Sequence, residues 1–435
     1  MSQLQNQYPL RVLLVHPGTQ HAPRLASELC RQGLLWRFWT GVASPKGRGE
    51  FKRSHFDIVK DQKRRRVVDI PREKLRTIPW VEVMALLLAR LPINKEALWH
   101  CRNGLFQKLV PRSEIEAADV VVGFDTSAWI MGERAKRAGK KFVLDQSVGH
   151  PVSRAKSVRQ AGGDETMWPE AFVPRSEMVK EAEAQEHALA DLVVVASSFS
   201  KKTLIENGVP EAKIRVLPYG VGCEFVAAGG AQCAHFDRDN FDILREDKRA
   251  TKPFRFLYAG YLTKRKGIGV LMEAWGARGA YFDRDNFDIL TDRKHEGAEL
   301  RLVGGGDQPE PLPAGVVCLG QTPREALLRE MSEADVFVFP SLFEGFALVI
   351  LEAMAAGLPV ITTPNTAGPD LIENGKEGLI VPAGDANALR EAMESLLNDR
   401  ERARAMGRAA HEKAKEFTWE RYGERWEEML HELCS

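Results

Sequence analysis

The sequence predicts an α/β protein built from two doubly wound domains, each with a parallel sheet, that face one another across a cleft. The chain has 435 residues, which is too long for one ordinary core and fits two α/β domains. Short apolar runs alternate with helical patterns in two successive series, the second of which begins near residue 254. Such alternation of strands and helices is typical of parallel sheets covered by helices.

The first series begins with a buried strand at residues 11–15, indicated by its continuous apolar character. A turn follows, and then a helix over residues 23–32 that Gly33 ends. The pattern predicts further strands at residues 120–122, 142–144, 192–195 and 214–217.

The second series repeats this order. The pattern predicts strands at residues 255–258, 300–303, 335–339, 359–362 and 378–381. It predicts helices at residues 267–275, 347–356 and 419–433. We therefore expect an N-terminal domain over residues 1–222, a linker or insertion over 223–252, a C-terminal domain over 253–415 and a final helical segment over 416–435.

One nine-residue segment, FDRDNFDIL, occurs identically at residues 236–244 and 282–290. The copies flank a strand and a helix, so we interpret them as inserted surface segments rather than units of a solenoid. Their acidic spacing suggests calcium, but no glycine or terminal glutamate completes a calcium loop. We predict no metal site, and the sequence gives no physical reason why the copies match.

The charge of the chain limits the kinds of partner that it can bind. The net charge is +1, which does not point to nucleic acid, but residues 46–112 hold 17 Lys/Arg against 7 Asp/Glu, a local excess of +10. Their basic cluster at residues 63–66 is either a solvated face or a surface for anionic lipid or a phosphorylated acceptor.

Other features of the sequence indicate the cellular compartment. The six cysteines are scattered without a C-x-x-C pair, which indicates reduced thiols in a cytosolic chain. The polar N-terminus predicts no signal peptide. The most apolar segment, residues 81–91, is far shorter than the roughly 20 residues that span a bilayer. We expect a cytoplasmic protein whose membrane contact, if present, is peripheral at the inner face.

The most informative segment joins the strand at residues 335–339 to the helix at 347–356. A helix N-terminus presents unpaired N–H groups and about half a positive charge, which suits a diphosphate. Glu352, in this helix, can accept hydrogen bonds from a ribose diol, whereas Glu344, in the loop, stays near diphosphate and sugar. The candidate donor-binding residues at the helix start are Gly345, Phe346, Ala347 and Leu348. The alternative is a helix cap with a surface glutamate.

A second loop, residues 260–267, also passes from a strand into a helix. Its three adjacent cations, Lys264, Arg265 and Lys266, can neutralise a diphosphate leaving group. Alternatively, the loop is a solvated basic turn. Both loops lie at carboxyl ends of strands, where open parallel sheets bind ligands.

Three weaker signals remain. The glycine triplet around Gly305 either lets the backbone approach a ligand or makes a tight turn. Gly18 lies in the loop after the first strand. His150 ends another strand-derived loop and either donates to a sugar hydroxyl across the cleft or is a structural histidine.

Together these segments resemble glycosyltransferase family 4, the retaining enzymes of the GT-B fold with two Rossmann-like domains. The resemblance covers nearly the whole chain and is most specific over residues 255–381. It rests on YAGYLTKRKG at 258–267, LVGGG at 302–306, FPSLFEGF at 339–346 and LEAMAAGLPV at 351–360. ASSFSK at 196–201 and VLPYGV at 216–221 are similar to the family's N-domain end and linker.

The resemblance implies a role for each matching residue. Glu352 would hold the ribose, Glu344 would touch the donor sugar, and Lys266 would neutralise the diphosphate. Gly18 would belong to an N-domain loop that closes over the phosphates. The segment 416–435 would pack back on the N-terminal domain.

The implied reaction transfers a sugar from a nucleotide-diphosphate sugar to a hydroxyl, in polysaccharide biosynthesis, with a glycan or lipid-linked acceptor. It implies no metal and no further cofactor. Candidate catalytic residues are Glu344, Lys266 and His150, and Arg265 joins the donor-binding set.

Two positions depart from the family pattern. Tyr261 stands where the family usually has Arg, so one phosphate cation is missing, and Arg265 or Lys264 is a candidate replacement. Ala347 stands where the family prefers Gly. Both departures support the alternative of a catalytically silent sugar-nucleotide-binding scaffold. An epimerase, a phosphorylase-like protein and a nicotinamide-binding protein are further alternatives, and the last is disfavoured because the first βα turn lacks G-x-G-x-x-G.

Overall fold

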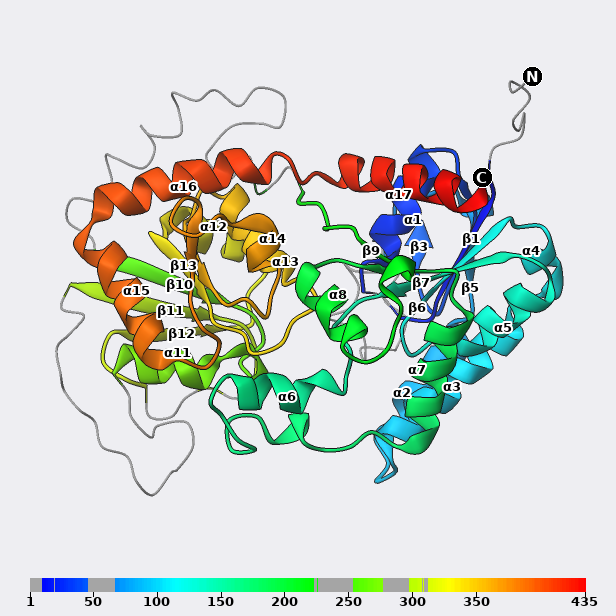
Figure 1. Cartoon of the computed structure of the whole chain (residues 1–435), viewed down its shortest axis with the longest axis horizontal. Coiled ribbons are helices and arrows are strands. Elements are labelled where there is room, and N and C mark those ends of the chain that lie inside the picture. The colour runs from blue at the N-terminus through cyan, green and yellow to red at the C-terminus, as the bar shows by residue number, and fades with distance from the viewer. Residues whose placement is uncertain are drawn as a thin grey trace.

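The computed structural model consists of two α/β halves lying side by side (Figure 1), and it describes residues 10–18, 20–45, 67–222, 225, 253–276, 297–306, 308 and 312–435. Each half has its own sheet, and every paired strand in both sheets is parallel. The predicted fold class is therefore confirmed. The basic cluster at 63–66, both copies of the nine-residue segment, Thr19 and Asp307 lie outside the described residues.

The N-terminal half contains a seven-stranded sheet in the order β5-β2-β1-β6-β7-β8-β9. Its strands are β1 (Val12–His16), β2 (Leu35–Thr40), β5 (Leu75–Thr77), β6 (Val120–Phe124), β7 (Lys141–Gln146), β8 (Leu192–Val195) and β9 (Ile214–Val216). All residues of β1 and β6 are buried, which explains their continuous apolar character. A separate two-stranded pair is formed by β3 (Ser44–Pro45) and β4 (Val67–Val68).

Helices cover this sheet. They are α1 (Ala22–Arg31), α2 (Pro79–Leu88), α3 (Lys95–Leu109), α4 (Arg112–Glu116), α5 (Trp129–Arg137), α6 (Ser153–Gln160), α7 (Glu177–Leu189) and α8 (Ser198–Ile205). The side chains of Asn94 and Ser197 cap the first turns of α3 and α8.

The C-terminal half contains a six-stranded sheet in the order β12-β11-β10-β13-β14-β15. Its strands are β10 (Phe254–Ala259), β11 (Ala298–Val303), β12 (Val316–Gly320), β13 (Val336–Phe339), β14 (Val360–Thr362) and β15 (Gly378–Ile380). Its helices are α11 (Ile268–Trp275), α12 (Arg324–Glu333), α13 (Leu348–Ala355), α14 (Gly368–Leu371), α15 (Ala386–Asn398) and α16 (Arg400–Ala414).

The strand order changes direction at one strand of each sheet, because β1 lies between β2 and β6, and β10 lies between β11 and β13. Open parallel sheets form ligand crevices outside the carboxyl ends of the strands at such points. The loops that follow β10 and β13 are the two loops that the sequence singled out.

The chain crosses between the halves twice, and the two crossings touch. Val221 donates its N–H to the carbonyl of Phe417 at 2.9 Å, and a Cβ added to Gly220 would lie 2.3 Å from the nitrogen of Trp419. After the second crossing, α17 (Trp419–Cys434) lies along α1 of the N-terminal half, as the red helix in Figure 1 shows. The final helix is thereby part of the N-terminal body.

Candidate functional site

The loop after β13 meets the loop after β10 through Glu344. Its Oε1 atom lies 2.7 Å from Nη1 of Arg265 and 3.4 Å from Nζ of Lys266. The same Arg265 nitrogen donates to the carbonyl of Phe343 at 2.7 Å. Glu344 is only 8 % exposed, so one buried carboxylate balances two cations at the edge of the sheet.

Backbone contacts hold these loops together. Leu342 donates its N–H to the carbonyl of Arg265 at 2.9 Å, and the Ser341 hydroxyl donates to that carbonyl at 3.1 Å. Gly267 has a φ of 75°, and a Cβ there would lie 1.9 Å from the carbonyl oxygen of Pro340. Only glycine combines that φ with that approach, so the three cations of the short helix η7 (Lys264–Lys266) have a fixed position.

The three cations have different surroundings. Lys266 lies 5.2 Å from the centre of the Phe339 ring and is the less exposed of the two cations that contact Glu344. Lys264 donates to the carbonyl of Thr166 in the other half at 2.9 Å. Tyr261 is 61 % exposed, so its side chain is accessible at the position where the family pattern has a cation.

The start of α13 has an unusual backbone. Ala347 has a φ of 64° and a ψ of 69°, in the left-handed region that disfavours residues with a Cβ. Leu348 follows it in the first turn and is half-buried. Phe346 is 2 % exposed and its ring lies 5.0 Å from that of Tyr219, just before the first crossing between the halves. The helix start is thus set by a strained residue and anchored by a buried aromatic contact.

Glu352 lies farther along α13 and is directed to another element. Its Oε1 atom lies 3.6 Å from Nη2 of Arg324 in α12. The Arg324 guanidinium lies 4.4 Å from the centre of the Phe225 ring. The two glutamates of this segment therefore have separate cationic neighbours, Arg265 and Arg324.

The three glycines at residues 304–306 differ in the space that surrounds them. Cβ atoms at Gly304 and Gly306 would lie 1.7 and 2.5 Å from the carbonyl oxygens of Gly260 and Leu262, so the protein's own backbone excludes side chains there. At Gly305 the nearest atom would be a ring carbon of Tyr261 at 3.5 Å, an ordinary contact. The fold thus explains the outer two glycines and leaves room at Gly305.

Gly345 lies where the two halves touch. A Cβ there would lie 1.9 Å from the carbonyl oxygen of Ser147, in the loop after β7. Its own carbonyl accepts hydrogen bonds from the hydroxyls of Ser197 at 2.5 Å and Ser200 at 3.2 Å. Sequence reasoning assigned Gly345 to the donor, whereas the structure gives its small size a second reason, the contact between halves.

His150 follows β7 on the same side. Its Nδ1 accepts the N–H of Val152 at 3.4 Å, which leaves Nε2 to carry the hydrogen. Burial, followed by the charges of Arg175 and Arg154, lowers the pKa of His150 to about 4. The ring is therefore neutral near pH 7 and can donate from Nε2. Its centre lies 5.6 Å from that of His187, whose pKa burial also lowers to about 4.

Gly18 lies over the ring of His16, because a Cβ there would lie 2.7 Å from His16 Nε2. Burial, then the charges of Arg102 and His21, holds the pKa of His16 well below its usual range. The Nδ1 atom of His16 lies 3.2 Å from the Ser127 hydroxyl. The structure thus places Gly18 beside a neutral, buried histidine at the end of β1.

Sequence reasoning missed a polar network at the ends of β6 and β7. His21 Nε2 lies 2.7 Å from Asp145 Oδ2, and the Tyr219 hydroxyl lies 3.1 Å from His21 Nδ1. Burial holds the pKa of Tyr219 well above its usual value, so its hydroxyl keeps its hydrogen at neutral pH. The available signal was positional, because Asp145 directly follows the predicted strand at 142–144 and therefore falls at the carboxyl end of that strand.

Two buried glutamates of α7 belong to this region. Glu186 accepts the N–H groups of Thr126 at 2.8 Å and Ala128 at 2.7 Å, yet burial raises its pKa to about 8. Glu183 pairs with Arg175, and burial raises its pKa to about 7. Thr126 itself has a φ of 62°, so Glu186 holds a strained residue at the end of β6.

Residues 253–399 match the model of the protein family described as Glycosyl transferases group 1. The amylovoran biosynthesis glycosyltransferase AmsK of Erwinia amylovora is 29 % identical over 205 residues, covering 46 % of either chain. A GDP-mannose-dependent alpha-(1-6)-phosphatidylinositol monomannoside mannosyltransferase of Mycobacterium tuberculosis is 26 % identical, covering 75 % of this chain and 77 % of its own. The chain spans about half the length of the first two curated relatives that it matches.

Among solved structures, Anabaena Alr3699/HepE in complex with UDP and glucose superposes with a TM-score of 0.61 at 15 % identity, covering 97 % of this chain and 100 % of that chain. Sucrose-phosphate synthase from Thermosynechococcus elongatus superposes with a TM-score of 0.59 at 20 % identity, covering 98 and 99 % of the two chains. These likenesses establish the fold. The sequence matches confirm the resemblance to glycosyltransferases.

Proposed function

This chain is a relative of the group 1 glycosyl transferases, and on that premise we propose that it transfers a sugar from a nucleotide-diphosphate sugar to an acceptor hydroxyl with retention of configuration. The observation that carries the proposal is the joint position of Arg265, Lys266 and Glu344 at the carboxyl ends of β10 and β13. Two fixed cations suit a diphosphate, and the buried carboxylate suits the hydroxyls of the attached sugar.

The chemistry needs little from the protein besides charge and position. The bond from the anomeric carbon to the diphosphate breaks, and a bond to the acceptor oxygen forms on the same face of the sugar. The departing phosphate oxygen takes the proton of the acceptor hydroxyl. Lys266 and Arg265 stabilise the negative charge that develops on the diphosphate, and contact between the halves at Gly345 limits access of water.

His150 has a supporting role in this proposal. With a pKa of about 4 it is neutral at physiological pH, so it does not act as a cationic acid. Its Nε2–H can donate to a sugar hydroxyl across the cleft. No metal ion has a part in the mechanism.

The named relatives support the substrate classes. One acts in amylovoran biosynthesis, one is a GDP-mannose-dependent mannosyltransferase and one solved structure contains UDP and glucose. We propose a nucleotide-diphosphate hexose as the donor and a glycan or a lipid-linked precursor as the acceptor, in the cytoplasm. The comparisons lend no support to the alternative of a catalytically silent scaffold.

We further propose peripheral membrane contact through residues 46–112. None of the described helices is both long and apolar enough to span a bilayer. One face of α2, however, is apolar and exposed, and Trp80 in this face is 52 % exposed. The exposed members of the face recur at helical spacing and are Trp80, Val83, Met84, Leu87 and Leu88. Leu91, just beyond the end of the helix, is also 52 % exposed.

Such a face is a candidate for burial in the headgroup region, particularly beside basic residues. Arg90 lies exposed just after α2, Arg72 lies exposed before β5, and the segment carries the local charge excess of +10. Met84→Glu combined with Leu88→Glu, and separately charge reversal of Lys63 to Arg66, should each reduce sedimentation with anionic vesicles. Leu312→Glu, at an exposed site elsewhere, is the control. Equal binding by all variants would remove the membrane contact from the proposal.

The donor site is tested first by calorimetry and thermal shift with UDP, GDP, ADP and their hexose conjugates. One nucleotide should bind, and Glu352→Ala should lose that binding because the ribose contact is gone. Glu391→Ala, an exposed glutamate in α15, is the matched control. Failure of every nucleotide to bind would overturn the proposed function.

A further inference from the structure

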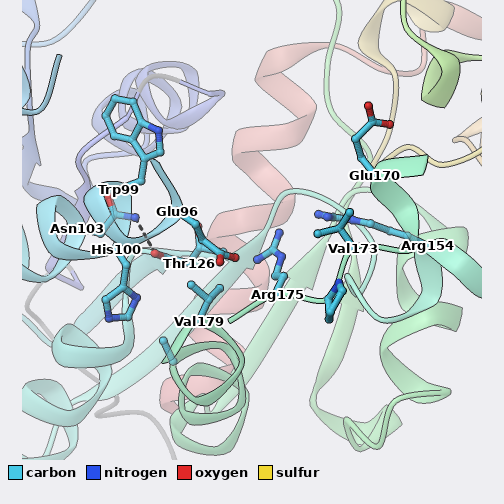
Figure 2. Close-up of a pocket in the computed structure, with 12 residues that line it drawn as sticks. Glu96, Trp99, His100, Asn103, Thr126, Arg154, Glu170, Val173, Arg175 and Val179 are labelled. Atoms are coloured by element: carbon cyan, nitrogen blue, oxygen red, sulfur yellow. Dashed lines mark hydrogen bonds between the residues drawn. The ribbon is translucent and has the colours of Figure 1, made fainter. Parts of the chain in front are cut away.

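A cavity of about 510 Å³ lies in the N-terminal half, apart from the cations of the donor loops. It is lined by α3, α6, α7 and the segment before α7. Figure 2 shows Trp99, His100 and Asn103 of α3 on one side, Arg154, Glu170 and Val173 on the other, and Arg175 between them. Thr126, at the end of β6, also contributes to its wall. Its size is that of a small-molecule site.

The carboxylates near this cavity already have partners. Glu183 pairs with Arg175, and Glu96 accepts the N–H of Ser176 at 3.2 Å. Asp125, buried nearby, accepts the N–H of Ser147 at 3.0 Å. Glu170 is exposed at the opposite end of the lining. The acidic groups are therefore occupied or solvated.

Arg154 differs from them. Among the described parts of the chain its guanidinium makes no hydrogen bond and no ion pair, although the residue is only partly exposed. Burial, followed by the charge of Arg175, lowers its pKa to about 10, and Arg265 of the other half contributes in the same direction. The charges of Glu183 and Asp125 oppose this shift of the pKa, but neither carboxylate pairs with the Arg154 guanidinium. A half-buried guanidinium beside two others is stabilised when an anion binds it directly.

We propose that this cavity binds an anionic group of the acceptor substrate, a phosphate or a carboxylate, through Arg154 and Arg175. The inference rests on the proposed function, since it names the acceptor class of the same reaction. Arginine suits both groups because its planar fork of donors matches their oxygens. Trp99, on the opposite side of the cavity, adds an aromatic ring to its lining against which a sugar ring can pack.

The position fits an acceptor rather than the donor. The cavity is bounded by helices of the N-terminal half, whereas Glu344, Lys266 and Glu352 all belong to the other half. Arg154 is nevertheless close enough to Arg265 for their charges to interact. A molecule held in the cavity by its anionic end can therefore extend a hydroxyl toward the donor loops.

The first test is protection of Arg154 from phenylglyoxal in the wild-type protein, read by peptide mass spectrometry. The probes are glucose 6-phosphate, glucuronate, glucose and UDP. Both anionic probes, or one of them, should protect Arg154, and the effective probe identifies phosphate or carboxylate as the preferred group. Protection by UDP alone would assign Arg154 to the donor, and equal protection by glucose or none by any probe would equally overturn the proposal.

The second test uses variants. Arg154→Gln should weaken binding of the effective anionic probe by about tenfold or more, as expected when a charge-assisted contact is lost, and should leave UDP affinity unchanged. Arg159→Gln, an exposed arginine of the same helix, is the control and should change neither. A reduced UDP affinity in Arg154→Gln contradicts the assignment. If anionic probes bind at Arg154 but no nucleotide binds the other half, the proposed function fails while the cavity keeps its ligand class.

Discussion

The guanidinium of Arg265 lies 2.7 Å from the carboxylate of Glu344, which follows it by 79 residues in the chain. Lys266 approaches the same oxygen at 3.4 Å. The carboxylate thus orients both cations and also reduces the positive charge that they offer to a diphosphate. Removing its charge and removing one cation should have opposite effects on nucleotide affinity.

Glu344→Gln should bind nucleoside diphosphate several-fold more tightly and turn over at least about 100-fold more slowly. Tighter binding follows because a buried negative charge is lost beside the diphosphate, and slower transfer follows because the sugar loses its carboxylate contact. Calorimetry and steady-state kinetics measure the two quantities. Weaker nucleotide binding would show that Glu344 serves mainly to position Arg265.

Lys266→Ala should lower kcat far more than it raises the KM for the donor, because the charge on the leaving diphosphate is greatest in the transition state. Lys266→Arg keeps the charge and should recover part of kcat. Lys264→Ala is the comparison within the same short helix and should lower kcat less, because Lys264 donates to the carbonyl of Thr166 of the other half. An unchanged kcat in Lys266→Ala would reject the assigned role.

Gly305→Ala and Gly304→Ala form a matched pair. A methyl group fits at residue 305 but lies 1.7 Å from the carbonyl of Gly260 at residue 304. We expect Gly305→Ala to keep the thermal stability and lose donor affinity, and Gly304→Ala to unfold at lower temperature. If Gly305→Ala binds the donor normally, the ligand does not approach that backbone.

Ala347→Gly should stabilise the protein by about 0.5–1 kcal/mol, since the left-handed backbone no longer carries a Cβ. Urea unfolding provides the measurement. Ala409→Gly, in the middle of α16, is the control and should cost about 0.5–1 kcal/mol. A loss of stability at both positions would mean that residue 347 is not strained.

His150 and His187 should make stability fall as the pH decreases from about 6.5 to about 4. Both have folded-state pKa values of about 4, so between these limits the unfolded chain binds protons that the folded chain does not. Each group contributes a slope of up to about 1.4 kcal/mol per pH unit. His187→Gln should therefore differ from wild type less at pH 4 than at pH 7, as followed by urea unfolding. A difference independent of pH would contradict the lowered pKa.

Much of the fold and part of the site could be predicted from the sequence because their signals are local. Apolar runs such as 120–122 and 192–195 lie within observed strands, and their alternation with helices requires parallel sheets. Polar loops after such strands necessarily gather at one edge. That reasoning placed Glu344 and Lys266 at the same edge before any contact was known.

Other features arise only from contacts between distant segments. Gly345 meets Ser147, Glu344 pairs with Arg265 and Arg154 lies beside the cavity of α3 and α7. The spacing of these residues along the chain does not predict their contacts, because the contacts depend on how the two sheets pack and on which residues become buried. The sequence by itself determined two doubly wound halves and the loops that carry the chemistry, whereas tertiary packing decided the charge balance at Glu344 and left Arg154 half-buried without an ion-pair partner among the described residues.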